Sequence, residues 1–266
     1  MKRINWIIQS NLIDNKTFEG LKKAVTADNA SYQEVYIIPF SNELDIQYDC
    51  DFINIFYGTT TLIMNASKVE VYRNGIFFDN GRFQMKKYLD EWKNSMLNSD
   101  GKVLTISEFV KETHNGKDEF FIRPNDDTKS FSGYVTNFAD FKEKATWADG
   151  QNPYYHMDSL ILVCKPKQIE KEWRNIIVKG KVVSSSRYSV YGKKSVDNKD
   201  IPDEMIQFAE DCCKTYNPHD VFVMDVALNR DNFYIIECNC FNDSGFYDHD
   251  IGEVVKSINN YMRERN

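Results

Sequence analysis

The chain has 266 residues, of which 42% are hydrophobic and 27% charged, and a formal net charge of -7. Because a single hydrophobic core stops growing at roughly 250 residues, this length favours two or three lobes. The composition is that of a folded globular protein and excludes a disordered chain, and the net acidic charge argues against general nucleic-acid binding.

The six cysteines include no CxxC pair with the spacing of a structural zinc site, so we expect reduced, buried thiols. The first residues lack the long apolar core of a signal peptide, and no later run approaches the roughly 18 apolar residues of a membrane span. We therefore expect no membrane partner and a cytoplasmic location.

The first hundred residues alternate short apolar runs with polar helical stretches, such as EVYIIPF and FEGLKKAV. This alternation predicts a small N-terminal α/β lobe over residues 1–101. Its end is marked by a turn-prone run from Asn98 to Lys102. Thr105 and Glu108 follow at the spacing that caps a helix start reciprocally, which predicts a short helix after Thr105.

Strand patterns dominate the chain from Glu119 onward. EKEWRNIIV and VVSSSRYSV form one predicted hairpin, joined at Lys179-Gly180, and VFVMDVAL and FYIIECN form a second. Between the hairpins, IPDEMIQFAEDCCKTY has a proline and acidic residues in its first turn, as helix starts commonly do. The sequence ends in a second amphipathic helix, IGEVVKSINNYM.

The second hairpin carries the sharpest chemical pattern. Strand alternation puts Asp225 on one face of the first strand, and Glu237 and Asn239 on one face of the next. An odd loop places Asp225 across from Glu237, whereas an even loop without a bulge separates them. Facing carboxylates among apolar residues need a cation or a shared proton between them, and with an Asn carbonyl they suit nucleotide-bound Mg²⁺. The alternative is that both carboxylates face solvent or pair with lysines.

The first hairpin is basic and complements the second. Glu172 and Arg174 share a face of its first strand, and Arg187 lies on the return strand. A two-residue turn at Lys179-Gly180 or one residue later predicts Arg187 on the same face as Arg174. Adjacent guanidinium groups match phosphate oxygens, and Glu172 would orient one of them. The alternative is an exposed Glu172–Arg187 pair worth under about 1 kcal/mol, with Arg174 in solvent.

A polar loop follows the strand EFFIRP and also carries cations. Arg123 at the strand end and Lys129 in the loop are candidates to hold phosphates, with Gly133 as a pivot. The loop lacks the Walker A pattern, and a plain connecting loop is the alternative. The chain also lacks HExxH and GxSxG motifs, so we expect no protein nucleophile.

In this order, the segments FIRP, TKSFSG, LILVC, EWR, SSSRY and MDVAL…IIECN resemble the ATP-grasp family. The resemblance covers roughly Lys102 to Asn266 and is closest to the divergent arginine/lysine-rich clade, which includes the eukaryotic assembly chaperone of a translation initiation factor. It implies an α+β fold. Two α+β lobes with antiparallel sheets, residues 102–163 and 164–266, would clasp ATP. The N-terminal α/β lobe would precede them in the chain.

Carried over motif by motif, the resemblance also implies roles for individual residues. ATP would contact Arg123, Lys129, Cys164, Lys165, Glu172, Arg174 and Arg187, with Lys129, Arg174 and Arg187 acting in catalysis and with Asp225, Glu237 and Asn239 holding Mg²⁺. The adenine would meet backbone groups at the hinge near Cys164 and Lys165. The chain departs from the family in two places, since VCKPK replaces the usual acidic hinge and DDTKSFSG replaces a glycine-rich loop.

The activity that the resemblance implies is ATP-dependent ligation of a carboxylate to an amine through an acyl phosphate. The carboxylate and amine substrates are unknown, and a peptide or protein belongs among the candidates. An ATP-dependent binding or assembly factor that forms no bond is the alternative, and a metal-dependent hydrolase using the same carboxylates is a third.

Overall fold

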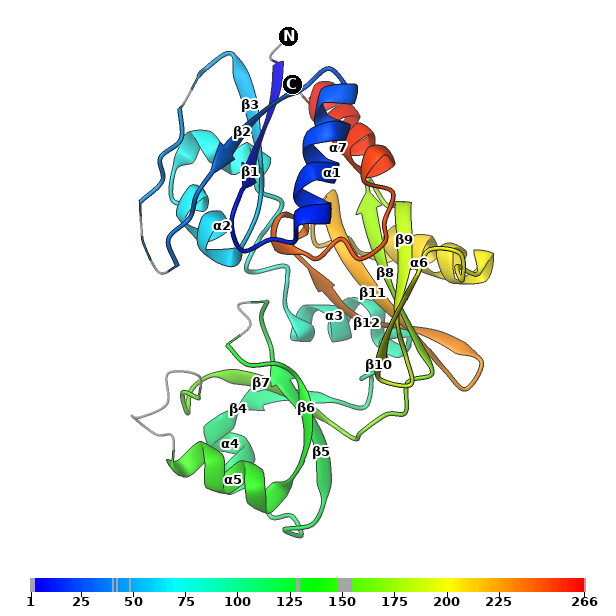
Figure 1. Ribbon diagram of the computed structural model, residues 1–266. Helices are drawn as coiled ribbons and strands as arrows, with labels where there is room; N and C mark the ends of the chain where they lie inside the picture. The colour runs from blue at the N-terminus through cyan, green and yellow to red at the C-terminus, as the bar shows by residue number, and fades with distance from the viewer. Residues whose placement is uncertain are drawn as a thin grey trace.

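The computed structural model describes residues 3–39, 41, 43–47, 49–127, 130–147 and 155–265. These residues form three β-sheets with helices packed against them (Figure 1). Within the described ranges, no helix has both the length and the apolar character needed to cross a membrane.

The N-terminal lobe contains a three-stranded parallel sheet. Parallel neighbours need a crossover, and a helix that begins after the capping residue Asp14 supplies it between the first two strands. The predicted α/β character of this lobe is therefore confirmed. The sheet order is β2 (Ser31–Val35), β1 (Arg3–Gln9) and β3 (Phe52–Tyr57), the crossover helix is α1 (Asn15–Ala27), and α2 (Thr60–Ser67) and the 3₁₀ helix η1 (Glu70–Gly75) follow β3.

The N-terminal lobe shares a hydrophobic core with the end of the chain. Helix α1 lies beside the last helix, α7 (Ile251–Arg265), as Figure 1 shows. The buried Asn242 amide donates to the carbonyls of Phe56 and Gly75, at 2.6 and 2.9 Å, and accepts from the Phe77 N–H at 2.7 Å. These bonds satisfy three backbone groups of the N-terminal part at once, which fixes it against the segment after the last strand.

A second sheet, antiparallel, forms the first half of the predicted clasp. It follows α3 (Met85–Trp92) and the 3₁₀ helix η2 (Lys93–Ser95), and its strand order is β4 (Lys102–Thr105), β7 (Leu160–Cys164), β5 (Glu119–Pro124) and β6 (Tyr134–Asn137). Helices α4 (Ile106–Lys111) and α5 (Phe138–Trp147) pack against it around a core of their own. The predicted cap is present, because the Thr105 hydroxyl accepts from the Glu108 N–H at 3.1 Å while the Glu108 carboxylate accepts from the Thr105 N–H at 2.7 Å.

The third sheet, also antiparallel, forms the second half of the clasp. Its order is β10 (Lys193–Asp197), β9 (Lys181–Val190), β8 (Lys171–Val178), β11 (Val221–Asn229) and β12 (Asn232–Asn239), with α6 (Asp203–Thr215) against one face. Both predicted hairpins are confirmed. The 3₁₀ helix η3 (Phe241–Asp243) lies in the segment that joins β12 to α7.

The two faces of this third sheet differ in what covers them. On one face, Ile176 and Val223 pack into the core shared with α7, and Arg174 and Asp225 continue the same face beyond that core. On the other face, Trp173 packs in the core below α6. The domain limits at residues 101 and 163 stay a prediction.

Candidate nucleotide site

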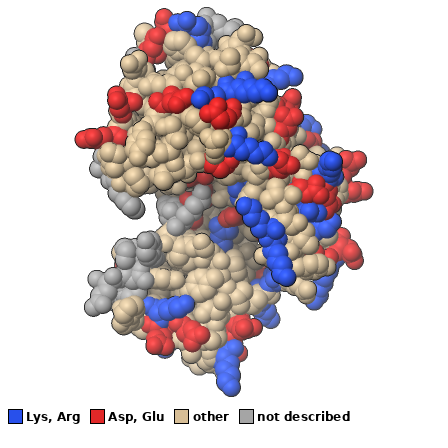
Figure 2. Space-filling model, viewed as in Figure 1, with Lys and Arg blue, Asp and Glu red and all other residues tan. Residues whose placement is uncertain are grey.

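A cavity of about 390 Å³ lies between the second and third sheets. In Figure 2 the molecule is hollowed between its upper part and its lower lobe. Side chains from β5, β8, β9 and β12 and from the segment after η3 line the cavity. Its charged and polar lining includes Arg123, Asp126, Asp127, Glu172, Arg174, Glu237, Asn239 and Asp243.

The two predicted metal carboxylates face each other across the β11–β12 ladder, since Asp225 is the register partner of Glu237. This pairing does not arise from a loop with an odd number of residues. The turn has two residues, Arg230 and Asp231, with φ angles of 48° and 65°, which suits a type I′ hairpin turn. A bulge between Asp225 and Val226 then shifts the register by one residue and restores the pairing.

Each carboxylate is bound by an arginine from a different strand. Arg174 on β8 donates from Nε and Nη2 to the two oxygens of Asp225, at 3.0 and 2.8 Å. Arg123 on β5, in the other sheet, forms an ion pair with Glu237. The alternative of solvent-facing or lysine-paired carboxylates therefore does not hold. The opposite charges predicted from the two hairpins meet in one cleft.

The pKa values of the two carboxyl groups shift in opposite directions. Burial, with the nearby charge of Glu237, raises the pKa of Asp225 above its ordinary value, against the opposing effect of Arg174. Burial would also raise the pKa of Glu237, but the charge and hydrogen bond of Arg123, with Arg174 behind it, hold that pKa below its ordinary value. The pair therefore does not titrate as two equivalent acids.

Two aromatic rings hold the Arg174 guanidinium in place. Its centre lies 5.0 Å from the ring centroid of Tyr247 and 5.7 Å from that of Tyr188. The two rings stack with centroids 5.1 Å apart and planes within 8°. The Tyr188 hydroxyl donates to Glu172 at 2.9 Å, so Glu172 holds one of the rings that lie against Arg174. Sequence reasoning missed Tyr188, because strand alternation puts it on the face opposite to Arg187, which was expected to face the cleft.

Arg187 does not reach this cleft. It is the register partner of Trp173, on the opposite face of the sheet from Arg174. There it forms ion pairs with Asp200 and, at 3.5 Å, with Asp197. The prediction that the two arginines share a face is wrong.

The physical reason is a β-bulge that the turn does not reveal. The turn lies at Lys179-Gly180, as predicted, with φ angles of 51° and 73°. A register shift between Ile176 and Ile177 moves the pairs from Ile176 to Trp173 by one residue, which turns Arg187 to the other face.

The predicted hinge residues lie outside the cavity lining. The Cys164 thiol is buried and contacts the Asn98 side chain at 3.3 Å. The Lys165 N–H donates to Asp100 at 3.3 Å. Their role toward the adenine stays a prediction, and Lys129 lies outside the described residues.

Gly133 lies where the loop after β5 returns across its strand. A Cβ at this position would come within 2.7 Å of the Phe121 ring and 3.1 Å of the Arg123 Cβ. The contact is too close for a larger side chain. The close approach explains the glycine, and its role as a pivot stays a prediction.

The oxygen atoms of Asp225 and its neighbours suit a hard cation as metal ligands. Asn239 is buried, and its amide donates to Asp225 at 3.4 Å and also hydrogen-bonds Glu237. Two carboxylates and an amide are the oxygen ligands that Mg²⁺ takes together with phosphate oxygens. The residues present therefore fit a nucleotide-bound Mg²⁺.

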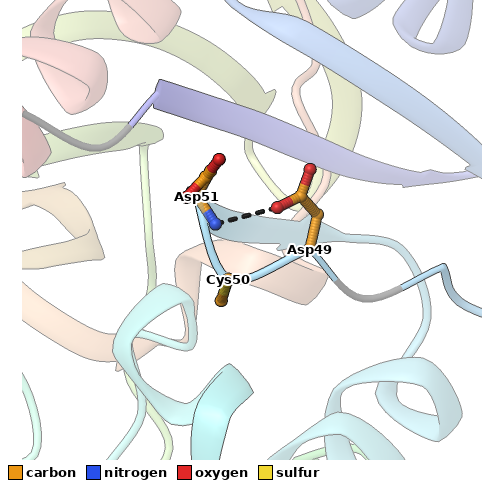
Figure 3. A group of neighbouring side chains, drawn as sticks. All are labelled: Asp49, Cys50 and Asp51. Carbon is orange, nitrogen blue, oxygen red and sulfur yellow. Dashed lines mark hydrogen bonds between the residues drawn. The ribbon is translucent and has the colours of Figure 1, made fainter.

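A separate acidic group lies in the N-terminal lobe, away from the cleft. Asp49, Cys50 and Asp51 place ligand atoms close together in the exposed turn before β3 (Figure 3). The Asp51 N–H donates to the Asp49 carboxylate at 2.9 Å, a local turn contact that accounts for the geometry. We assign no site to this group.

Comparisons with known proteins identify the family and the fold. Residues 81–258 match the family model described as "ATP-grasp domain, R2K clade family 3". No curated protein matches the sequence.

Several solved structures share the fold at low sequence identity. D-cycloserine synthetase DcsG aligns with a TM-score of 0.64 and 9% identity over 97% of this chain and 99% of its own. D-alanine–D-alanine ligase from Bacillus anthracis aligns at 0.54 and 13% over 100% of both chains. The ATP-grasp ligase PsnB, complexed with precursor peptide PsnA2 and AMPPNP, aligns at 0.56 and 9% over 100% of this chain and 99% of its own.

The matched segment begins before the first antiparallel sheet and extends into the last helix, so it contains Arg123, Arg174 and the β11–β12 carboxylates. The α+β arrangement of two antiparallel sheets expected from the sequence is confirmed by these neighbours. The chain belongs to the ATP-grasp family, in R2K clade family 3.

Proposed function

We propose that the chain binds ATP with Mg²⁺ in the cavity between its two antiparallel sheets and ligates a carboxylate to an amine. The observation that carries the proposal is the pair of arginine–carboxylate contacts from both lobes, Arg123 with Glu237 and Arg174 with Asp225. In one cleft, the two arginines supply positive charge for phosphate oxygens, and the two carboxylates supply negative charge for a metal ion. The lobes 102–163 and 164–266 are, in this proposal, the two halves of the clasp.

Arg123 and Arg174 would hold the phosphates from opposite sides of the cleft. Each approaches from its own sheet, so the triphosphate would bridge the two lobes. Bidentate guanidinium groups favour phosphate oxygens, and the tyrosine rings beside Arg174 fix its orientation in advance. Arg187 is left out of the site because it faces the other side of the sheet.

Asp225, Glu237 and Asn239 would hold the Mg²⁺. When bound, the metal would neutralise charge on the phosphate oxygens. The buried position of Asp225, only 1% exposed, excludes water from one side of the proposed ligand set.

The reaction follows from charge placement rather than from a protein nucleophile. An oxygen of the carboxylate substrate attacks the γ-phosphorus, and the bond to the departing ADP breaks. The amine nitrogen then attacks the acyl carbon, phosphate leaves with the bonding electrons, and the amine loses its proton. Arg123 and Arg174 stabilise negative charge on the transferring group, which explains why no catalytic triad is needed.

Three ligase or synthetase structures with this fold support ligation over a non-ligating assembly factor. The bound precursor peptide in the PsnB structure also makes a peptide substrate a reasonable candidate here. A ligase should release ADP and phosphate only when both substrates are present. A protein that holds ATP without turnover under every substrate combination would favour the assembly factor.

The direct test is calorimetric titration of ATP in the presence and absence of Mg²⁺. Glu237→Ala should abolish measurable Mg²⁺-dependent binding because it removes a cleft carboxylate. Glu253→Ala, on an exposed position of α7, is the matched control and should bind as the unmodified protein does. Unchanged affinity in Glu237→Ala would refute the proposed site.

A further inference from the structure

A second cavity, of about 340 Å³, opens beside the nucleotide cavity. It lies between α2 and the segments that follow η1 and β12. Most of its wall is apolar, in contrast to the charged nucleotide cavity. The apolar side chains are Ile63, Met64, Ile76, Phe78 and Cys240.

The two cavities meet at a pair of carboxylates, since Asp127 and Asp243 line both. Asp127 accepts a hydrogen bond from the Cys240 N–H at 3.0 Å. Asp243 accepts one from the Thr60 hydroxyl at 2.7 Å. These contacts hold the two carboxylates at the boundary that the two cavities share, which we call the passage. A molecule in the apolar cavity would therefore reach the phosphate region past negative charge.

The charge of the second cavity's lining favours one of the two substrates, the amine or the carboxylate. Among the described lining residues, Asp127 and Asp243 are acidic and Lys68 is basic, with its ammonium group donating to Asn65 at 3.2 Å. These described residues, two carboxylates and one ammonium group, carry a formal net charge of -1. An alkylammonium group would be attracted to this passage and a carboxylate repelled. The cationic environment that suits a carboxylate lies instead at Arg123 and Arg174.

We propose that the second cavity binds the apolar side group of the amine substrate, with its amino group directed past Asp127 and Asp243 toward the acyl phosphate. This inference rests on the proposed ligase function. Attack by the neutral amine forms the C–N bond as the carbon–oxygen bond to phosphate breaks. The bound ammonium first loses one proton to a carboxylate at the passage, which gives the neutral amine, and the nitrogen loses a second proton to water as the amide forms. The substrate class is a primary amine with a branched aliphatic or aromatic side group.

Probe molecules that share one side group test the charge preference. The protein, loaded with Mg²⁺ and AMPPNP, would be titrated with 3-methylbutylamine, 4-methylpentanamide and 4-methylpentanoate by ligand-observed NMR. We expect the amine to bind most tightly and the carboxylate most weakly. Equal affinities, or tightest binding of the carboxylate, would overturn the assignment.

The apolar contribution is tested with methylamine, which lacks the side group. Filling a hydrophobic pocket with additional carbon atoms typically changes affinity tenfold or more, so 3-methylbutylamine should bind at least about tenfold more tightly than methylamine. Equal binding of the two amines would contradict a role for the apolar cavity.

A substitution at the opening of the second cavity tests whether the amine binds there. Met64 is 57% exposed, so Met64→Trp should fill the opening without disturbing the core. It should weaken 3-methylbutylamine binding at least about tenfold. Val71→Trp, at an exposed position of η1 outside the cavity, is the control and should change nothing. Unchanged amine binding in Met64→Trp, with a native melting curve, would place the amine elsewhere.

ATP titration of the same variants separates this inference from the proposed function. Met64→Trp should retain the Mg²⁺-dependent ATP affinity while losing the amine. If ATP binds normally but no amine preference is found, only the second cavity has been wrongly assigned. If ATP does not bind to the unmodified protein, the nucleotide site itself is wrong.

Discussion

The two arginines of the β8–β9 hairpin lie on adjacent strands but have different surroundings. Arg174 faces the cleft, where it binds the buried Asp225 and lies against two tyrosine rings. Arg187 faces away, where it binds Asp200 and the Ser195 carbonyl, at 3.2 Å for the latter. The face of the sheet, rather than the residue type, decides which arginine is available for a nucleotide. The cleft face should therefore carry both the larger stability effects and the ligand effects.

The largest expected effect is on the cleft face. Asp225→Ala would leave the Arg174 guanidinium without its carboxylate in a largely buried position. Removing one partner of a buried pair typically costs 3–5 kcal/mol, and we expect a loss of about 3 kcal/mol in the free energy of unfolding. Urea denaturation measures it.

The matched control lies on the far face of the same sheet. Asp200→Ala removes a carboxylate that also binds an arginine, but its side chain is 26% exposed. We expect a loss of about 1 kcal/mol, because water replaces the missing partner. Equal losses for the two variants would remove the energetic difference between the faces.

The next largest difference should be in ATP affinity, between variants of Arg174 and Arg187. Arg174→Ala should weaken Mg²⁺-dependent ATP binding between about tenfold and a hundredfold, since hydrogen bonds to charged groups contribute roughly 1.5–3 kcal/mol. Arg187→Ala should leave the affinity within about twofold. Calorimetric titration of both variants makes the comparison, and the reverse result would restore Arg187 to the site.

The sequence predicted the fold and the two hairpins that line the cleft because both depend on local patterns. Strand alternation and the hairpin turns placed Asp225 and Glu237 in one ladder, and the order of motifs identified the ATP-grasp arrangement. Arg123 was predicted from its place at a strand end. Its partner Glu237 comes from another sheet, so only the tertiary structure shows the contact.

The sequence failed where a single extra residue changes a register. A bulge on β8–β9 moved Arg187 away from the cleft, and a bulge on β11–β12 brought Asp225 opposite Glu237 after an even turn. Bulges depend on packing around the whole sheet, and neither of these was marked by a glycine. The tyrosine stack on Arg174 was equally inaccessible, because Tyr247 joins it from a loop.

Acid titration should sharpen the comparison through Glu237. Its folded-state pKa is held below the ordinary value of 4.5, so ionisation favours the folded state. The resulting stability is fully present above pH 4.5 and is lost as the pH falls through the folded-state pKa. Glu237→Gln should therefore lower stability most at neutral pH.

Urea denaturation of Glu237→Gln and the unmodified protein from pH 7 to pH 3 makes this measurement. The difference between the two unfolding free energies should shrink below pH 4.5. A difference that stays constant across the range would mean that Arg123 does not favour the ionised form of Glu237 in solution.

The smallest expected effect belongs to Lys171, which reaches Asp200 at 2.8 Å on the far face. Hydrogen bonding from Lys171, together with Arg187, holds the pKa of Asp200 below its ordinary value. Lys171→Met should cost under about 1 kcal/mol, because the ion pair is partly exposed and Asp200 keeps Arg187. It should also raise the pKa of Asp200, measured by NMR titration, while ATP affinity stays unchanged. A loss of stability as large as that of Asp225→Ala would show that the far-face pairs act as one cooperative network, and the contrast between the faces would then lie in ligand binding alone.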